Sequence, residues 1–85
     1  MAVPFNLTIV SADKPPNHKE VTSLIAPGES GYLGILAHHA PLITSLAAGT
    51  ITFTEVSGSR TVLRCEAQGF LRVSGNNVTL LLENK

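Results

Sequence analysis

The chain has 85 residues, which is enough for one domain with a single hydrophobic core and leaves no room for a second domain. Its six basic and six acidic residues cancel, so the charge that would attract nucleic acid or an anionic membrane surface is missing, and no nucleic-acid partner is expected. Only 14% of the residues are charged, against about 25% in an average globular domain. Part of the surface is therefore neutral, which is a mild sign of a partner-covered face or of a surface rich in Ser, Thr and Asn.

A single cysteine, Cys65, excludes an internal disulfide and is typical of proteins in a reducing compartment. The start Met-Ala-Val-Pro-Phe lacks the basic region and the apolar run of a signal peptide. No stretch approaches the roughly 18 apolar residues needed to span a bilayer. We therefore expect an intracellular chain that meets a membrane only through a partner.

The first third of the chain predicts two strands with a proline-rich turn between them. Residues 5–10 alternate apolar and polar side chains, which is the period of a half-buried strand. Residues 11–17 contain Pro15 and Pro16, which cannot donate to a ladder, and they are predicted to end the strand. Residues 20–25 predict the second strand, with a bulge or twist because Val21 and Leu24 are not in strict alternation.

Glycines punctuate the next segment and predict a turn followed by short extended pieces. Residues 26–31 have turn chemistry throughout and predict an exposed loop tip, in which Gly28 and Gly31 can take positive φ values. Residues 33–37 are too few for a stable helix and predict extended pieces that partly bury Leu33 and Ile35. Pro41 biases Ala40 away from the helical region.

The second half of the chain repeats a pattern of short strands and Gly, Ser or Asn turns. Ile51 and Phe53 are predicted to face the core, Phe70 is predicted as a further core side chain, and Cys65 shares a face with Leu63. The predicted strands are residues 42–46, 50–56, 60–66, 69–73 and 78–82. With no helical segment of note, the chain predicts one all-β domain over residues 1–85, an antiparallel β-sandwich or flattened barrel of about eight to ten short strands.

No constellation of side chains predicts catalysis, a metal site or a cofactor. His38 and His39 are adjacent, and neighbours on extended chain point to opposite sides, so they rarely bind one ion together. Cys65 in mid-strand is predicted to be a small inert core residue. The glycine-rich run 28–34 lacks the Lys-Ser/Thr ending of a phosphate-binding loop, and it favours a close backbone approach with Tyr32 as an interface contact.

A signature loop and four further ordered segments resemble the epsilon subunit of the F-type rotary ATP synthase. The run 31–43, with Gly-Tyr-Leu-Gly-Ile and His39-Ala-Pro-Leu, is similar to the signature loop of that family. Residues 5–12 resemble its first strand with the Val-Ser-Ala ending, and Gly49-Thr-Ile resembles the opening of its middle strand. Residues 69–73 and 76–81 resemble the two segments near the end of its β domain. The resemblance covers nearly the whole chain.

The resemblance implies a non-catalytic rotor subunit with an N-terminal β-sandwich. Members of the family bind the gamma subunit of the central stalk and rest on the membrane ring of c subunits, so that proton-driven rotation reaches the catalytic head. By position, the loop touching the c-ring would be Glu29, Ser30, Gly31 and Tyr32. The residues towards the gamma subunit would be Ser11, His39, Leu42 and Thr44. The implied location is the cytoplasmic face of an energy-coupling membrane, as a peripheral subunit without cofactors.

The sequence departs from the family pattern at three places. Tyr32 stands where many members have an acidic residue, which puts the electrostatics of ring contact in doubt, and Gln68 replaces the first glycine of a Gly-Gly pair. Most members continue into a C-terminal helical hairpin that can inhibit ATP hydrolysis, whereas the given sequence stops at Lys85. Both a truncated and a naturally short chain fit this end; Met1 and the lack of a tag favour the short form, which would lack the helical brake.

Two functions of other classes stay open at this point. A free-standing β-sandwich module would bind a peptide, sugar or small ligand with the loop of residues 28–39 as its pocket. A thiol-dependent enzyme would use Cys65 with a histidine and would lose activity on Cys65→Ala. The low charge and the four matching segments favour the stalk subunit over both.

Overall fold

A computed structural model describes residues 3–12, 14–66 and 68–83 of the chain. These residues form eight strands and contain no helix, so the predicted all-β fold is confirmed. The strands are β1 (Phe5–Ser11), β2 (Lys14–Gly28), β3 (Gly31–Ile35), β4 (Leu42–Leu46), β5 (Gly49–Glu55), β6 (Arg60–Cys65), β7 (Gly69–Ser74) and β8 (Asn77–Leu82).

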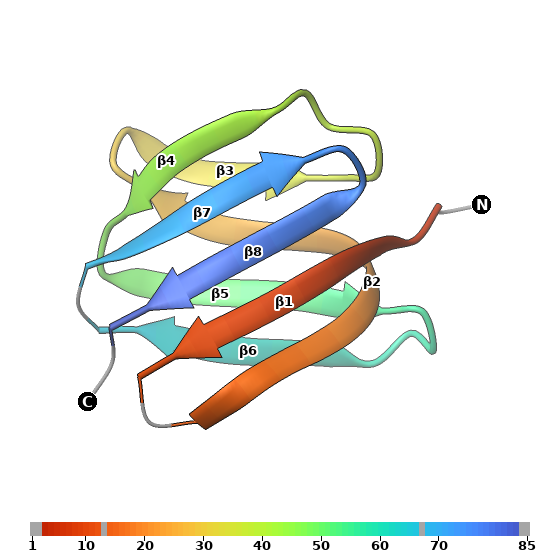
Figure 1. The fold of residues 1–85 in the computed structure, drawn as a ribbon, viewed down its shortest axis with the longest axis horizontal. Helices are drawn as coiled ribbons and strands as arrows, with labels where there is room; N and C mark the ends of the chain where they lie inside the picture. Colours follow the sequence, from red (N-terminus) through yellow and green to blue (C-terminus); the bar gives the residue numbers. More distant parts are fainter. Residues whose placement is uncertain (1–2, 13, 67, 84–85) are drawn as a thin grey trace.

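The strands form two packed layers that share the long strand β2 (Figure 1). Their order is β1-β8-β7-β4-β2-β5-β6, with β3 paired to β2 and a further pairing of β1 with β2. In the view of Figure 1, β4, β7, β8 and β1 lie in front, and β3, β5 and β6 lie behind. We call these the front sheet and the back sheet. The first and last strands, β1 and β8, pair in parallel, and the other pairings are antiparallel.

One hydrophobic core lies between the layers, and every strand contributes to it. The alternating strands place their inward residues there, so the predicted burial of Ile51, Phe53 and Cys65 is confirmed. Phe70 was predicted as a core side chain, and this is wrong, because it is 49% exposed. Its neighbours Leu71 and Val73 occupy the inward positions of β7, and a period of two then turns Phe70 outward.

β1 ends at Ser11, within the segment predicted to end it, but Pro15 and Pro16, which were predicted in the connecting turn, lie within β2. Residues 14–19 of β2 pair with β1, and no described strand pairs with their other edge. A proline at such an edge loses no ladder hydrogen bond, which is why the strand tolerates both. Asp13, within the predicted turn, lies outside the described residues.

The second half of β2 also runs further than predicted. A register shift between Val21 and Ser23 confirms the predicted bulge. Ala26, Pro27 and Gly28 were predicted in an exposed loop tip, but they are buried strand residues that pair with β3. Gly28 also pairs with Leu46 of β4, so this end of β2 is enclosed by two neighbouring strands. The turn itself is limited to Glu29 and Ser30.

The predicted extended path after the turn is confirmed as β3, in which Ile35 is buried and Leu33 half-buried. Gly31 has the predicted positive φ of 130°, which only glycine adopts readily, whereas Gly28 does not have a positive φ. After β3, His38 takes a φ of 63°, and its N–H donates to Oδ1 of Asn76 at 3.1 Å. Asn76 Nδ2 in turn donates to the Pro4 carbonyl at 3.0 Å, so this side chain joins three segments.

Candidate functional site

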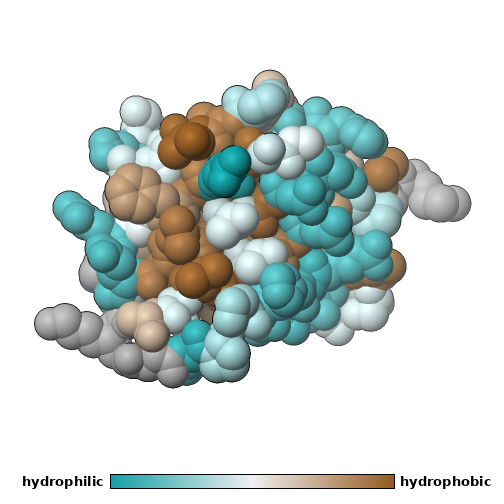
Figure 2. All heavy atoms as spheres, viewed as in Figure 1, coloured by the Kyte–Doolittle hydropathy of each residue, from teal (hydrophilic) through white to brown (hydrophobic). Residues whose placement is uncertain are grey.

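The outward positions of the front sheet carry four apolar side chains that we call the outer apolar patch: Val10, Ile43, Phe70 and Leu81. Leu81 stands between Val10 of β1 and Phe70 of β7 in the strand register. Ile43 of β4 stands opposite Arg72, two residues along from Phe70. Ile43 is 72% exposed, Phe70 49% and Leu81 43%. Figure 2 shows hydrophobic side chains gathered on the left of this face, over β7 and β8.

The local sequence places these side chains outside because each lies between two inward residues. Leu80 and Leu82 flank Leu81 and are buried in the core. Large apolar side chains that share one exposed face are a mark of a protein–protein interface. Ordinary alternation puts polar residues at such positions, so this face is the candidate interface.

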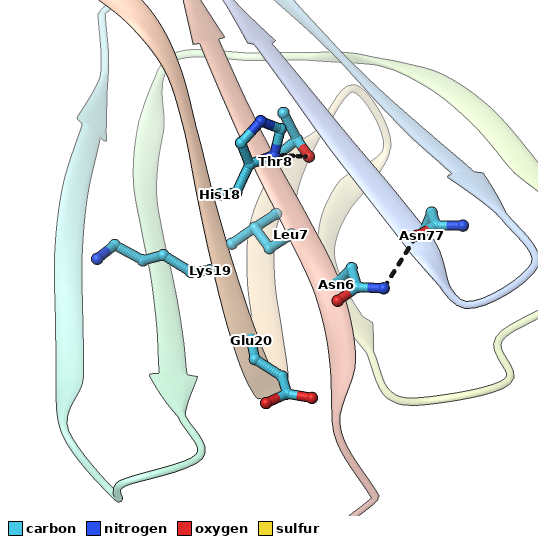
Figure 3. A pocket seen from close by; sticks show the side chains of 7 residues that line it. All are labelled: Asn6, Leu7, Thr8, His18, Lys19, Glu20 and Asn77. Carbon is cyan, nitrogen blue, oxygen red and sulfur yellow. Dashed lines mark hydrogen bonds between the residues drawn. The ribbon is translucent and has the colours of Figure 1, made fainter.

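The other end of the same face is polar and slightly hollowed. In Figure 3, Asn6 Nδ2 donates to Oδ1 of Asn77 at 3.1 Å, and Thr8 Oγ1 lies 3.0 Å from Nδ1 of His18. The hollow is lined by residues of β1, β2 and β8: Asn6, Leu7, Thr8, His18, Lys19, Glu20 and Asn77. None of them comes from residues 28–39, the loop considered as a ligand pocket, and four of their polar side chains already pair, Asn6 with Asn77 and Thr8 with His18.

The predicted c-ring loop consists of the two-residue turn between β2 and β3 and the first two residues of β3. Glu29, Ser30, Gly31 and Tyr32 are all exposed. Oε2 of Glu29 accepts a hydrogen bond from Ser45 Oγ of β4 at 2.7 Å. Oη of Tyr32 accepts one from the Thr50 N–H of β5 at 3.1 Å. The structure therefore brings the four residues together on a turn whose two ends are tied to different sheets.

The predicted gamma contacts lie in two separate places. Ser11 ends β1 beside Leu82, while the other three residues lie on or before β4, and β8 and β7 stand between β1 and β4. Leu42 is half-buried and packs against the core. Thr44 pairs with the buried Leu71, so it shares the inward parity of Leu42.

His39 precedes β4 and is half-buried. Its Nδ1 lies 2.8 Å from the Ala40 carbonyl, which can only accept, so the proton is assigned to Nδ1.

Sequence reasoning missed Ile43, Phe70 and Leu81 as candidate interface residues. A signal was present, because each belongs to a strand in which apolar residues occupy both parities. In β8 the side chains of Leu80 and Leu82 face one side of the sheet and that of Leu81 faces the other. At least one leucine therefore lies outside, whichever side is buried. Such a strand either lies in the middle of a structure or faces a partner.

Groups with reactive chemistry do not converge on a site in the described part of the chain. Cys65 is fully buried as a core side chain, as predicted. Across residues 3–12, 14–66 and 68–83, no group of three His, Cys, Asp or Glu side chains is placed to hold a metal ion. The same residues include no helix of the length and hydropathy that crossing a membrane requires.

Comparison with known proteins identifies relatives over almost the whole chain. The sequence model of the family "ATP synthase, Delta/Epsilon chain, beta-sandwich domain" matches residues 4–84. The chain is 37% identical over 83 residues to the ATP synthase epsilon chain of Dichelobacter nodosus, which covers 98% of this chain and 57% of that protein. It is 40% identical over 81 residues to that of Carboxydothermus hydrogenoformans, covering 95% and 59%. The chain thus spans less than two thirds of the length of these curated relatives.

A solved structure shares the fold. A chain in the cryo-EM structure of the Euglena gracilis mitochondrial ATP synthase superposes with a TM-score of 0.87 at 20% identity. The match covers 95% of this chain and 51% of that chain. At this level of identity the likeness concerns the β-sandwich fold alone.

Proposed function

This chain belongs to the ATP synthase delta/epsilon chain β-sandwich family, and from that membership we propose that it is a non-catalytic subunit of the central stalk. In this function it links the gamma subunit to the membrane c-ring and so couples proton flow to ATP synthesis. It would sit as a peripheral subunit on the cytoplasmic face of an energy-coupling membrane, and it would reach the membrane only through the complex.

The observation that carries the proposal is the outer apolar patch. A stalk subunit that turns with the gamma subunit needs a lasting contact with it, and lasting protein contacts have an apolar centre with a polar rim. The patch resembles this arrangement in part, because Ile43, Phe70 and Leu81 adjoin the charged Arg72, and the polar end of the same face lies on one side of them. We assign the gamma subunit to this face. Of the contacts that the resemblance implied, Leu42 and Thr44 flank Ile43 on the same strand but have the inward parity, so Ile43 is the β4 residue that we assign to the contact.

The exposed turn between β2 and β3 is the proposed contact with the c-ring. It offers a carboxylate at Glu29, an exposed backbone at Ser30 and Gly31, and the phenol of Tyr32. Polar groups of this kind match the polar loops that the ring presents in this family. The turn and the outer apolar patch involve different residues, so the two partners can be tested separately.

A binding assay with a matched control tests the gamma contact. Ile43→Asp puts a charge at the most exposed residue of the outer apolar patch, and Val62→Asp puts the same charge at a comparably exposed position, 62%, on the outer face of β6. Purified gamma subunit is titrated against immobilised wild-type chain and both variants. We expect Ile43→Asp to weaken binding at least about 30-fold, as loss of an interface anchor does, and Val62→Asp to bind like the wild type. Absence of binding by the wild-type chain, or equal loss in both variants, would contradict the proposal.

A further inference from the structure

The backbone ladder between β2 and β5 stops short of the turn. The strands are in register from Ser23↔Thr54 to Ile25↔Thr52, and continuing this register would place Pro27 opposite Thr50. Pro27 has no N–H, and its carbonyl accepts a hydrogen bond from Ala47 instead, at 2.8 Å. The N–H of Thr50 donates to Oη of Tyr32 at 3.1 Å. A side-chain hydroxyl therefore occupies the place where a ladder partner would stand.

Gly49 allows this contact because the tyrosine comes very close to its backbone. A Cβ at position 49 would lie 2.7 Å from Oη of Tyr32 and 2.9 Å from Cβ of Pro27. Real Cβ atoms essentially never approach other atoms so closely, so an alanine here would push the phenol away. Tyr32 is also the register partner of Pro27. Tyr32, Pro27 and Gly49 thus meet at one point beside the Thr50 amide.

The other end of the same turn is tied to the front sheet. Glu29 accepts the hydrogen bond of Ser45 Oγ at 2.7 Å, and Ser45 belongs to β4. The two-residue turn, Glu29 and Ser30, is thus held by Tyr32 towards β5 and by Glu29 towards β4. Since the turn is exposed, these two hydrogen bonds restrict its position without burying it.

We propose that Tyr32 is a positioning residue for partner binding: by accepting the Thr50 N–H it holds the β2–β3 turn, and with it Glu29, in the geometry that docks on the c-ring. This inference rests on the proposed function, in which the turn is the ring contact. In this inference Tyr32 acts through its hydrogen bond to the Thr50 backbone of β5. The family resemblance implied only that Tyr32 contacts the ring directly.

Amide hydrogen exchange measures the anchoring without any partner. Tyr32→Phe removes only the hydroxyl and keeps the ring. We expect the Thr50 amide of this variant to exchange about 5- to 10-fold faster, which is the protection that one hydrogen bond provides. Thr22→Val is the control, because it removes another hydroxyl that bonds β5, at Thr54, far from the turn. Unchanged exchange at Thr50 in Tyr32→Phe would overturn the inference.

Affinity for a purified gamma–c-ring subcomplex tests the consequence for binding. We expect Tyr32→Phe to weaken binding about 5- to 10-fold, on the energy of one hydrogen bond, and Thr22→Val to bind like the wild type. Gly49→Ala disturbs the same hydrogen bond from the other side, because its Cβ would meet both the phenol oxygen and Pro27 while the hydroxyl stays in the chain. We expect Gly49→Ala to weaken binding as well, and the double variant to bind no more weakly than Gly49→Ala alone, because both changes break one bond.

The possible outcomes distinguish the inference from the function on which it rests. If wild-type chain does not bind the subcomplex, the proposed function fails, and the exchange of Thr50 alone decides whether Tyr32 anchors the turn. If wild-type chain binds and Tyr32→Phe binds equally well, the stalk function stands and the positioning role is wrong. Weakened binding in Tyr32→Phe with wild-type affinity in a folded Gly49→Ala would assign Tyr32 to direct contact and would also overturn the inference.

Discussion

Strands β5 and β7 have the same alternation but different outer faces. On β5, Ile51 and Phe53 are buried, and the alternate positions are threonines, at 50, 52 and 54. On β7, Leu71 and Val73 are buried, and Phe70 stands outside at 49% exposure. Both strands fill the same core, so the difference lies entirely on the surface. Of these two strands, only β7 contributes to the outer apolar patch.

The comparison shows that alternation identifies a strand before it identifies the buried side. Residues that stand opposite each other on paired strands share one face of the sheet, so a residue is inside when its register partners are inside. Phe53 pairs with the buried Leu24, whereas Phe70 pairs with Leu81 and Ser45 on the outer face. An apolar residue on the outer face leaves its hydrophobic surface in water. A partner that covers this surface gains about 25 cal/mol of free energy for each Å² of apolar area removed from water.

The largest expected effect is the difference between the two phenylalanines. Phe53→Ala leaves a cavity in the core and should lower the free energy of unfolding by about 3–5 kcal/mol, which is a large share of the stability of so small a domain. Phe70→Ala should cost about 1 kcal/mol or less, because the ring is half in water already. Urea unfolding of both variants measures this. Similar costs for the two substitutions would contradict the assigned faces.

The same contrast applies within β4, to two adjacent residues. Leu42→Asp places a charge against the core and should lower the free energy of unfolding by about 2–4 kcal/mol. Ile43→Asp places it outside and should cost about 1 kcal/mol or less. Thermal unfolding followed by circular dichroism separates them. A folded, stable Leu42→Asp chain that has lost gamma binding would show that Leu42 faces the partner after all.

A smaller effect is expected at Asn76, in the turn that joins β7 to β8. Asn76→Ala removes the acceptor of the His38 N–H and the donor to the Pro4 carbonyl, and should cost about 1–2 kcal/mol. Asn76→Asp keeps the acceptor of the His38 N–H but puts a second carboxylate oxygen against the Pro4 carbonyl, so it should destabilise the chain as well. Urea unfolding measures both variants, and wild-type stability of Asn76→Ala would contradict the assigned contacts.

The positions of most strands could be predicted from the sequence, because short alternating runs between turns rich in Gly, Ser and Asn are typical of strands. Residues 42–46 were predicted with the bounds that the structure has. The prolines of β2 were misassigned because the rule against proline in strands does not apply at an open sheet edge, and sequence alone does not tell which strand is an edge.

The candidate site was harder to predict than the fold. Family resemblance supplied Leu42 and Thr44 as gamma contacts, yet it says nothing of parity, and the structure turns both towards the inside and Ile43 outward. The hydrogen bond from the Thr50 N–H to the Tyr32 side chain joins residues 18 positions apart, so no local sequence pattern predicts it. The close approach of another backbone was nevertheless expected from the glycines around Tyr32.

Hydroxyl-radical footprinting of the chain alone and bound to the gamma subunit tests the central claim most directly, because it reads the exposure of each side chain. We predict that oxidation of Ile43, Phe70 and Leu81 falls on binding, while that of Ile25 of β2 and Val62 of β6, on the opposite face, stays unchanged. Protection of Ile25 and Val62 with unchanged reactivity of the outer apolar patch would place the gamma subunit on the opposite face and contradict the account.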